Sequence, residues 1–446
     1  IPDADFLAGG SELNFSGGGS GLIVNEGTIT IHGSAGTSTG TASGTGVAPG
    51  YVVLSGAGVS HQGLISGELT QVVIGGAEAY VLRLNGSGVF YEISEALRSN
   101  PGDLFAAIEV GGEIRGAARV LLTASAIDTV YDSAVNMDGV IEGSQIVIDA
   151  AGDVTIAGSL DAAEDVTISA SQPDTFAGPS SFDNGVDITI TSDAIVSAGR
   201  DVRLTAVGRV GVYGSITADQ HVGIEGASFF LSGLSSASSG PVAGVSPFGS
   251  IGAATVSVVV DDVDIGGRIT ADAAYFSPNE LADIYLGGSP ADDGAALVFT
   301  QADLNGISAP EIIFSAPICD CGRAGVGGSI FINGDVAFGA PNTAQRSVFL
   351  FGHWVRQETG FDEFGSTAGR ITAPQLGVGA VGSINLGFNR NAVGEFAAES
   401  GTGAIDLANS GPLVIAAELT ATSIPEAEFD GRSLRGVHAG VTTGPT

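Results

Sequence analysis

Three aspartates in the stretch VVVDDVDIGG (258–267) are the first candidates for chemistry in this sequence. Asp262 and Asp264 stand two positions apart beside Asp261, so in an extended strand they should share the outward face, and Arg268 follows them. Such carboxylates could bind calcium or a sugar. Hydrolysis of a polysaccharide needs two carboxylates at a suitable separation, and a lyase needs a strong base near a calcium-bound uronate. A solvated acidic strand face is the structural alternative.

The two cysteines, Cys319 and Cys321, form a second candidate in the stretch ICDCG. With one residue between them a disulfide is strained but feasible, and two thiolates alone make an incomplete zinc site. Three alternatives stay open: a strained or partly formed disulfide, free buried thiols, and a metal or redox site. Two cysteines cannot supply a framework of disulfides.

Five histidines offer no catalytic pattern. They lie far apart in the sequence, and none stands near a cysteine or in a ligand-spaced pair: His32, His61, His221, His353 and His438. We expect them at turns or on the surface, without a zinc site or a histidine-activated nucleophile. A Gly-x-Ser-x-Gly elbow in a hydrolase context is also missing. The sequence therefore predicts a non-enzyme without a cofactor, calcium being the weak exception at Asp262 and Asp264.

Aromatic residues gather around the stretch SVFLFGHWV (347–355). The group comprises Phe314, Phe331, Phe349, Phe351 and the single tryptophan, Trp354. One interpretation is a stack of phenylalanines in the interior. The alternative is an exposed aromatic groove for a glycan or a protein partner, and Trp354 beside His353 is the candidate position for it.

Composition limits the class of protein that can carry these residues. Of 446 residues, 70 are glycine and 44% are hydrophobic, and the mean hydropathy of +0.34 is too apolar for a disordered linker. Apolar runs are short and the chain opens on no signal segment, so we expect no membrane insertion. The net charge of −34, with no lysine, makes nucleic acid a poor partner. The acidity fits either a soluble surface in a salty medium or binding of divalent cations.

A short phrase recurs along the chain. GRITA occurs at 267–271 and at 369–373, and GSITA at 214–218. The general form Gly-x-[Ile/Leu]-x-[Ala/Gly] also fits GLISG (63–67), GEIRG (112–116), GVIEG (139–143) and GSLDA (158–162). A second phrase of alternating hydrophobic residues follows most copies, as in DVTISA at 165–170. The repeat unit is therefore a strand, a turn and a second strand.

Repetition of this kind predicts an all-β protein built as a right-handed parallel β-helix with extra-coil loops. A β-sandwich would need Asn-Gly or Asp-Gly hairpins, which are scarce. Helical spacing is weak and confined to YEISEALRSN (91–100). In a β-helix, equal positions of successive repeats stack. The expected placements are Ile269 and Ile371 inward, Arg268, Thr270, Arg370 and Thr372 outward, and Gly267 and Gly369 at corners.

Interruptions of the strand repeat indicate where the loops lie and where the β-helix ends. We predict surface loops at 33–50, 171–185, 235–249 and 356–369, because their Ser, Gly and Pro content cannot build a core. The β-helix should span 1–423. Residues 424–446 lose the periodicity and should form an irregular tail, a cap or a joint.

The first 143 residues resemble the filamentous-haemagglutinin-like large exoproteins of the two-partner secretion route in Gram-negative bacteria. The phrases that carry the resemblance stand in the order typical of that family: IPDADFLAG (1–9), GLIVNEGTIT (21–30), GYVVLSGAGVSHQGLISG (50–67), ARVLLTASA (118–126) and SAVNMDGVIEG (133–143). Residues 144–423 resemble only the generic β-helical shaft of these proteins.

This resemblance implies a right-handed β-helix that crosses the outer membrane through a partner β-barrel transporter and folds outside the cell. The family's secretion module, with Asn-Pro-Asn signatures, is not in the chain, so we expect a segment of a longer exoprotein or a processed one. The expected function is non-catalytic: an extracellular adhesin, filament or biofilm-matrix protein that contacts glycans or proteins on cell surfaces. The open ends of the rod could stack into a homo-oligomer or filament. A polysaccharide lyase or hydrolase is the alternative.

Overall fold

Strands make up nearly all the regular structure of the computed structural model, which confirms the predicted all-β class. The model describes residues 12–16, 21–31, 50–85, 88–102, 104–126, 130–172, 185–232, 249–279, 281–288, 296–317, 327–339, 346–357, 369–422, 433–434 and 437–438. Among them the helix is α2 (Gln301–Gly306), which begins at a capping box of Thr300 and Asp303. The four predicted loops lie almost entirely outside the described residues.

Contacts within the chain divide it into two compact units, Ile1–Asp219 and Gln220–Thr446. The strands of unit 1 are β1 (Glu12–Phe15), β2 (Leu22–Asn25), β3 (Thr28–Thr30), β4 (Tyr51–Gly56), β5 (Gly58–His61), β6 (Leu64–Gly76), β7 (Ala79–Asn85), β8 (Gly88–Glu95), β9 (Ala106–Val110), β10 (Glu113–Ser125), β11 (Ser133–Met137), β12 (Val140–Ala151), β13 (Val154–Ile156), β14 (Ser159–Ser171), β15 (Ile188–Ile190), β16 (Ile195–Ala198), β17 (Asp201–Ala206), β18 (Arg209–Val212) and β19 (Ser215–Ala218).

Unit 2 begins directly after β19. Its strands are β20 (His221–Leu231), β21 (Ser250–Gly252), β22 (Thr255–Ile265), β23 (Arg268–Thr270), β24 (Ala273–Ser277), β25 (Asp283–Leu286), β26 (Ala296–Phe299), β27 (Ile307–Ser308), β28 (Glu311–Ser315), β29 (Ile330–Ile332), β30 (Val336–Ala337), β31 (Ser347–Gly352), β32 (Val355–Gln357), β33 (Ile371–Ala380), β34 (Ile384–Ser400), β35 (Ile405–Asn409), β36 (Val414–Ile415), β37 (Leu419–Thr420), β38 (Ser433–Leu434) and β39 (Val437–His438).

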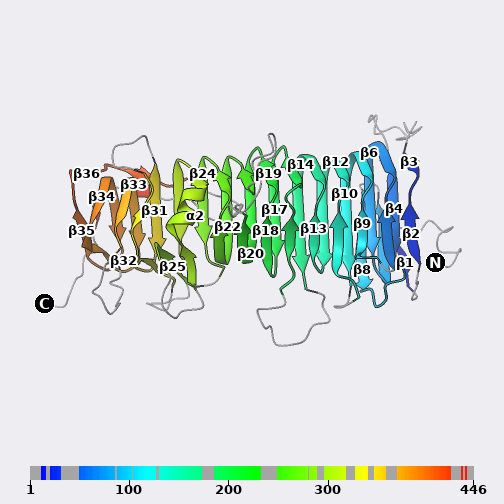
Figure 1. The fold of residues 1–446 in the computed structure, drawn as a ribbon, viewed down its shortest axis with the longest axis horizontal. Helices are drawn as coiled ribbons and strands as arrows, with labels where there is room; N and C mark the ends of the chain where they lie inside the picture. Colours follow the sequence, from blue (N-terminus) through cyan, green and yellow to red (C-terminus); the bar gives the residue numbers. More distant parts are fainter. Residues whose placement is uncertain are drawn as a thin grey trace, which may run out of the picture. The chain divides into compact units, whose positions relative to one another are not determined.

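Parallel pairing in unit 1 places equal positions of successive repeats side by side. Strands β6, β10, β12 and β14 follow one another in register (Figure 1). The third residues of the recurring phrase form one row, each at most 1% exposed: Ile65, Ile114, Ile141, Leu160, Val196 and Ile216. Val196 belongs to a copy with alanine in place of the first glycine, AIVSA, which the sequence pattern missed.

We call the face with these buried rows the inner face and the opposite one the outer face. Each fully buried Ile, Leu or Val side chain contributes about 1.5–3 kcal/mol of transfer free energy, so every repeat stabilises its neighbours. The third residue of the phrase is also buried in unit 2, where Ile269 and Ile371 are both 0% exposed. Arg268, Thr270 and Arg370 are exposed and Thr372 is half-buried, as the alternation predicts.

The glycine that opens each phrase packs closely against the preceding copy. A Cβ on Gly112, Gly139 or Gly158 would collide with the carbonyl oxygen of the previous glycine in the column. Positive φ, a common reason for glycine at a bend, is found at other glycines among the described residues, such as Gly116 and Gly152. Glycine is therefore required at these positions because neighbouring strands leave no space for a side chain.

The interior of unit 2 is partly aromatic. Phe276 and Phe314 occupy equal positions on β24 and β28, stack with ring centroids 5.6 Å apart, and are fully buried. Phe314 therefore lies inside, as predicted for the phenylalanines.

Phe349 and Phe351 correct that prediction, because they lie on the outer face of β31. Their in-register neighbours Val348 and Leu350 occupy the inner face. Both rings are nevertheless 1% exposed, because the C-terminal segment covers them. The buried cluster comprises Ala273, Tyr275, Ile313, Phe349, Phe351, Ala397, Ala416, Leu419, Ala421 and Leu434.

We call residues 416–422 and 433–434 the C-terminal strap. Its strands β37 and β38 pair in an antiparallel manner. The carboxylate of Glu311 accepts hydrogen bonds from the backbone N–H of Thr422 at 2.6 Å and from its hydroxyl at 2.9 Å. Beyond the strap, β39 pairs with β34. The described part of the predicted tail is therefore folded against unit 2.

Candidate functional site

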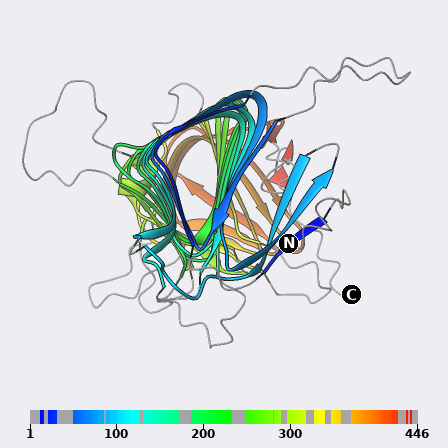
Figure 2. The same ribbon diagram turned by 90° about the vertical axis from the view of Figure 1, so that its right-hand side faces the viewer.

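A small antiparallel sheet stands on the outer face of unit 1. Strands β1, β7 and β8 form it, and it lies outside the stack of parallel strands (Figure 2). Leu13, Leu82 and Val89 turn inward and pack on Val73 of β6. On the solvent side Arg83 makes ion pairs with Glu12 at 3.0 Å and with Glu92 at 2.6 Å. Alternation along the strands thus fixes which face is apolar.

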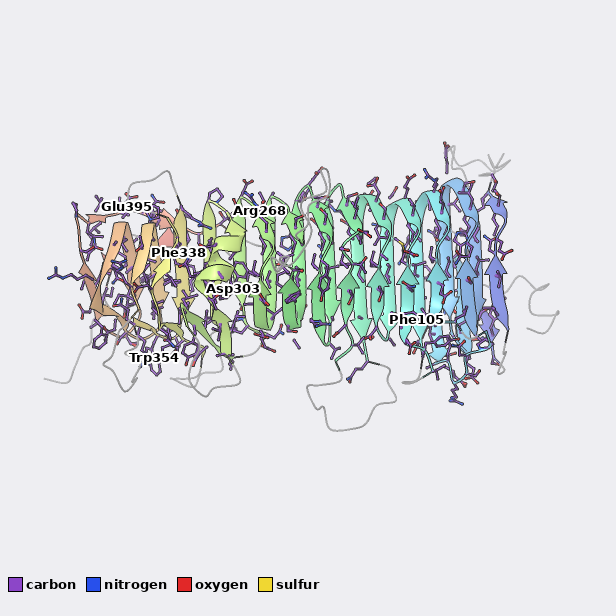
Figure 3. The ribbon with its side chains drawn as sticks, in the orientation of Figure 1. Phe105, Arg268, Asp303, Phe338, Trp354 and Glu395 are labelled. Carbon is purple, nitrogen blue, oxygen red and sulfur yellow. The ribbon has the colours of Figure 1, made fainter. Side chains whose placement is uncertain are left out.

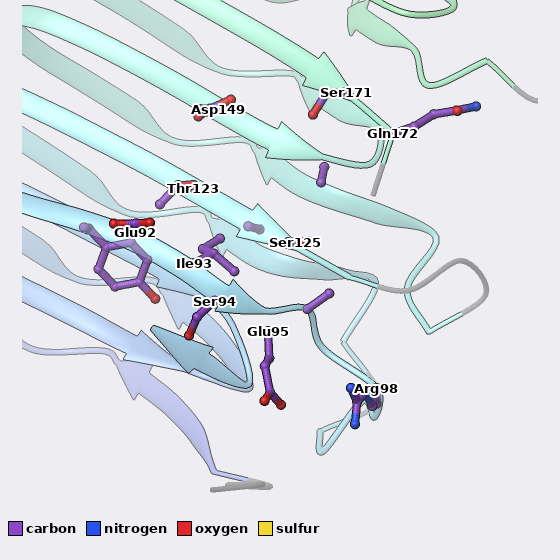
Figure 4. Close-up of a pocket in the computed structure, with 14 residues that line it drawn as sticks. Glu92, Ile93, Ser94, Glu95, Arg98, Thr123, Ser125, Asp149, Ser171 and Gln172 are labelled. Carbon is purple, nitrogen blue, oxygen red and sulfur yellow. The ribbon is translucent and has the colours of Figure 1, made fainter. Parts of the chain in front are cut away.

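A groove opens where this sheet ends at β8. Figure 4 shows the side chains that surround it. Its volume is about 460 Å³, within the range of about 300–1,000 Å³ that is usual for ligand sites. Its lining residues come from β8 and from the ends of β10, β12 and β14: Tyr91, Glu92, Ile93, Ser94, Glu95, Ala96, Arg98, Thr123, Ala124, Ser125, Asp149, Ala151, Ser171 and Gln172.

The floor of the groove is polar and regular. Thr123 and Asp149 are in register on β10 and β12. Ser125, Ala151 and Ser171 form the next row across β10, β12 and β14. Neighbouring strands lie about 4.8 Å apart. Each strand of the floor contributes one accessible polar side chain: Ser125 on β10, Asp149 on β12 and Ser171 on β14.

The groove carries more acid than base. Three carboxylates, those of Glu92, Glu95 and Asp149, face one guanidinium, that of Arg98. Glu92 is held by Arg83, and Arg98 lies 3.9 Å from Glu78. Asp149 and Glu95 make no side-chain hydrogen bond with any described residue, and both are exposed. Their oxygen atoms are therefore available to a ligand.

Tyr91 forms part of the wall of the groove, and its hydroxyl group already has a hydrogen-bond partner. Its hydroxyl lies 2.6 Å from the hydroxyl of Ser55. Burial raises the pKa of Tyr91 well above its usual value, with a smaller contribution from Tyr80 in the same direction. The phenol therefore stays protonated at neutral pH and serves as a structural group.

Asp262 and Asp264 lie together on the outer face of β22, as the alternation predicts. Burial raises the pKa of Asp264, and the charges of Asp303 and Asp262 raise it further. The carboxylate of Asp303 already accepts hydrogen bonds from the backbone N–H groups of Ile265 and Thr300. The described residues contain no group of three or more His, Cys, Asp or Glu arranged to hold a metal. Calcium binding at Asp262 and Asp264 stays a prediction.

Trp354 lies at the surface of unit 2 (Figure 3), with 37% of the residue exposed, whereas His353 is only 7% exposed. The two rings meet edge to face at 4.5 Å. The guanidinium of Arg356 lies 4.7 Å from the Trp354 ring and 5.2 Å from that of Phe331. This stack fixes the tryptophan side chain. A binding role for Trp354 and His353 stays a prediction.

The expectation that the histidines lie at turns or on the surface is wrong for His61 and His221, which are buried within β5 and β20. His353 is also buried, but it lies at the bend between β31 and β32. The ring nitrogens of His221 lie 2.8 Å from the Thr255 hydroxyl and 3.0 Å from that of Ser257. Sequence reasoning missed this Ser–His contact because the partners are 36 positions apart. Both residues are buried in neighbouring strands, so the contact links β20 to β22.

The remaining candidates, Cys319 and Cys321, lie outside the described residues, as does His32. Among the described residues, no helix has the length and apolar character needed to cross a bilayer. Comparisons of the chain with protein-family models, with curated proteins and with solved structures find no match.

Proposed function

We propose that this chain is a right-handed parallel β-helix that serves as a rigid, non-catalytic structural and adhesive protein outside a Gram-negative cell. The observation that carries the proposal is the buried row from Ile65 to Ile216, in which one side-chain position recurs through six strands in register. Such a core has only nearest-neighbour contacts between repeats, and it suits a stiff scaffold whose outer face is free to vary.

The resemblance of residues 1–143 to filamentous-haemagglutinin-like exoproteins supports the same proposal. Export through a partner β-barrel transporter, followed by folding outside the cell, is part of it. The acidic composition, with a net charge of −34, fits a large surface that must stay soluble in a salty medium. Glycans or proteins of cell surfaces are the proposed contacts, and the groove beside β8 is a candidate contact surface.

Self-assembly end to end is the oligomeric form that we propose. In unit 1 the strand β2 leaves Leu22 36% and Val24 51% exposed. In unit 2 the strand β36 leaves Val414 56% and Ile415 51% exposed. Exposed apolar side chains on such strands favour pairing with another copy.

Electron microscopy and a cell-adhesion assay with the purified chain test these proposals. Rods that adhere to cells and join at their ends are the expected result, and isolated short rods would contradict self-assembly. A Val414→Glu, Ile415→Glu variant should then remain as single rods. Globular particles without adhesion would contradict the scaffold proposal.

An enzymatic assay covers the alternative function. Cleavage of pectin- or alginate-type polymers, abolished by Asp262→Asn or Asp264→Asn, would show a polysaccharide lyase or hydrolase and overturn the non-catalytic assignment.

A further inference from the structure

The outer face of unit 1 changes its chemistry at the edge of β8. Beneath β7 and β8 the parallel sheet presents Val73 and Leu121 to the inward side chains of the antiparallel sheet. Beyond β8 it presents the exposed side chains of Asp149 and Ser171 to the groove, whereas Thr123, which also lines it, is only 7% exposed. The apolar part is covered by the chain itself, whereas the polar part is open.

We propose that this groove binds a short, linear, neutral oligosaccharide that lies across β10, β12 and β14. The proposal rests on the adhesive function proposed above, because it names the class of ligand that the surface contacts. Exposed hydroxyl, carboxylate and amide groups line the groove in the form of Ser171, Asp149 and Gln172. Together they offer both donors and acceptors to the hydroxyl groups of a sugar.

Spacing favours a linear polymer. Ser125, Asp149 and Ser171 place one accessible polar side chain on each of the neighbouring strands β10, β12 and β14. The interval between strands is about 4.8 Å, close to the length of one pyranose unit in an extended chain. Successive sugar units would therefore meet successive strands of the floor.

Charge selects among sugars. Glu95 and Asp149 have no ion-pair partner among the described residues, and Arg98 is the only cation in the lining. Uronic acids and sulfated sugars would place further negative charge beside these carboxylates, which is unfavourable. A neutral sugar can instead donate its hydroxyl hydrogens to them, and such charge-assisted hydrogen bonds are the stronger kind.

An extended peptide is a weaker fit, although β8 is the edge strand of its sheet among the described residues. A strand added to that edge would lie over Asp149 and Thr123 and would remove the carboxylate from water. Burying an unpaired charge is costly. The added strand would gain no apolar surface like the one that Val73 and Leu121 provide for β7 and β8.

Titration calorimetry with the full chain tests the proposal. The probes are hexasaccharides of glucose, mannose and N-acetylglucosamine, with hexagalacturonate as the anionic counterpart. We expect saturable binding of at least one neutral hexamer and none of hexagalacturonate. Asp149→Ala should lower the affinity about tenfold, in keeping with the loss of a hydrogen bond to a charged group. Gln172→Ala, at an exposed position, should weaken binding less.

Asp138→Ala is the matched control, because Asp138 is an exposed aspartate of unit 1 outside the groove, and it should bind as the wild type does. Circular dichroism confirms that each variant is folded, and Gln172→Ala keeps the test decisive if Asp149→Ala does not fold. Failure of every neutral hexamer to bind would overturn the proposal. Tighter binding of hexagalacturonate or of extended peptides would also overturn it. Rods that adhere to cells without binding any hexamer would refute this groove assignment and leave the adhesive function standing.

Discussion

Gly139 lies directly against the carbonyl group of Gly112 in the preceding repeat. The N–H of Val140 donates to that carbonyl oxygen at 3.0 Å, and the same oxygen occupies the place that a Cβ on residue 139 would take. Equivalent contacts join Gly63 to Gly112 and Gly139 to Gly158. In these copies the glycine that opens the recurring phrase is therefore dictated by the closeness of neighbouring backbones.

Gly139→Ala should destabilise unit 1. The methyl group must push against backbone atoms, which cannot move without disturbing the ladder, and overpacking of this kind costs about 1–3 kcal/mol. Urea unfolding followed by circular dichroism measures the change. The control is Gly27→Ala at the start of the column, where a Cβ would approach only Asn25 Oδ1 at 3.9 Å. Equal stability of the two variants would contradict the steric explanation.

Ile371→Asp should unfold much of unit 2. The Ile371 side chain is 0% exposed, so the substitution buries a carboxylate without a partner and should cost more than about 4 kcal/mol. The neighbouring Arg370→Ser changes an exposed side chain and should stay within about 0.5 kcal/mol of the wild type. Thermal unfolding of both variants checks the prediction. A soluble, fully folded Ile371→Asp protein would show that the inner face tolerates charge.

His61 should make the stability of unit 1 depend on pH. Its Nε2 donates to the Glu113 carbonyl oxygen at 3.2 Å, and its Nδ1 accepts from the Asn25 side chain at 3.0 Å, so the ring fits its site in the neutral form. Burial lowers the pKa of His61 below its ordinary value of 6.5, and interactions with the backbone carbonyl groups of Glu113 and Asn25 only partly offset this.

The sign of the pH effect follows from this lowered pKa. Between pH 6.5 and the lowered pKa, the unfolded chain binds a proton at His61 and the folded chain does not. The free energy of unfolding should therefore fall as the pH falls through that window, by about 1.4 kcal/mol for each pH unit. Urea titrations at pH 7.5, 6.5 and 5.5 measure the slope. His61→Gln lacks the titrating group and should show a flatter slope, and an unchanged slope would assign the effect to other residues.

Leu434→Ala should release the C-terminal strap. Leu434 is 2% exposed and lies against Phe349 above Gly377, so truncation leaves the outer aromatic rings partly uncovered and costs about 2–5 kcal/mol of local stability. We expect faster amide exchange in residues 416–422 and increased binding of a hydrophobic dye. Val414→Ala, at a position that is already 56% exposed, is the control. Unchanged exchange in Leu434→Ala would mean that the strap does not depend on this contact.

The buried rows were readable from the sequence because each depends on one local rule. Ile269 and Ile371 alternate with exposed residues at the period of a strand, and the phrase that carries them recurs. The same rule placed Asp262 and Asp264 on one outer face. It failed for Phe349, because alternation tells which residues share a face and not whether another segment covers that face.

The groove beside β8 had no comparable signal. Its wall comes from Tyr91–Glu95, a stretch whose spacing suggested a helix, and its floor comes from Thr123, Asp149 and Ser171 on three different strands. Only strand registration brings these residues together. A polar outward residue looks the same in the sequence whether it faces open solvent or a groove.

The sequence alone determined the all-β class and the residues that stack in the inner rows, since side-chain alternation and glycine spacing are properties of short segments. The tertiary structure decided which outer faces are covered. It placed Leu434 over Phe349 and left Asp149 open beside β8. Covering a face requires contacts between segments distant along the chain, and those contacts depend on the packing of whole strands.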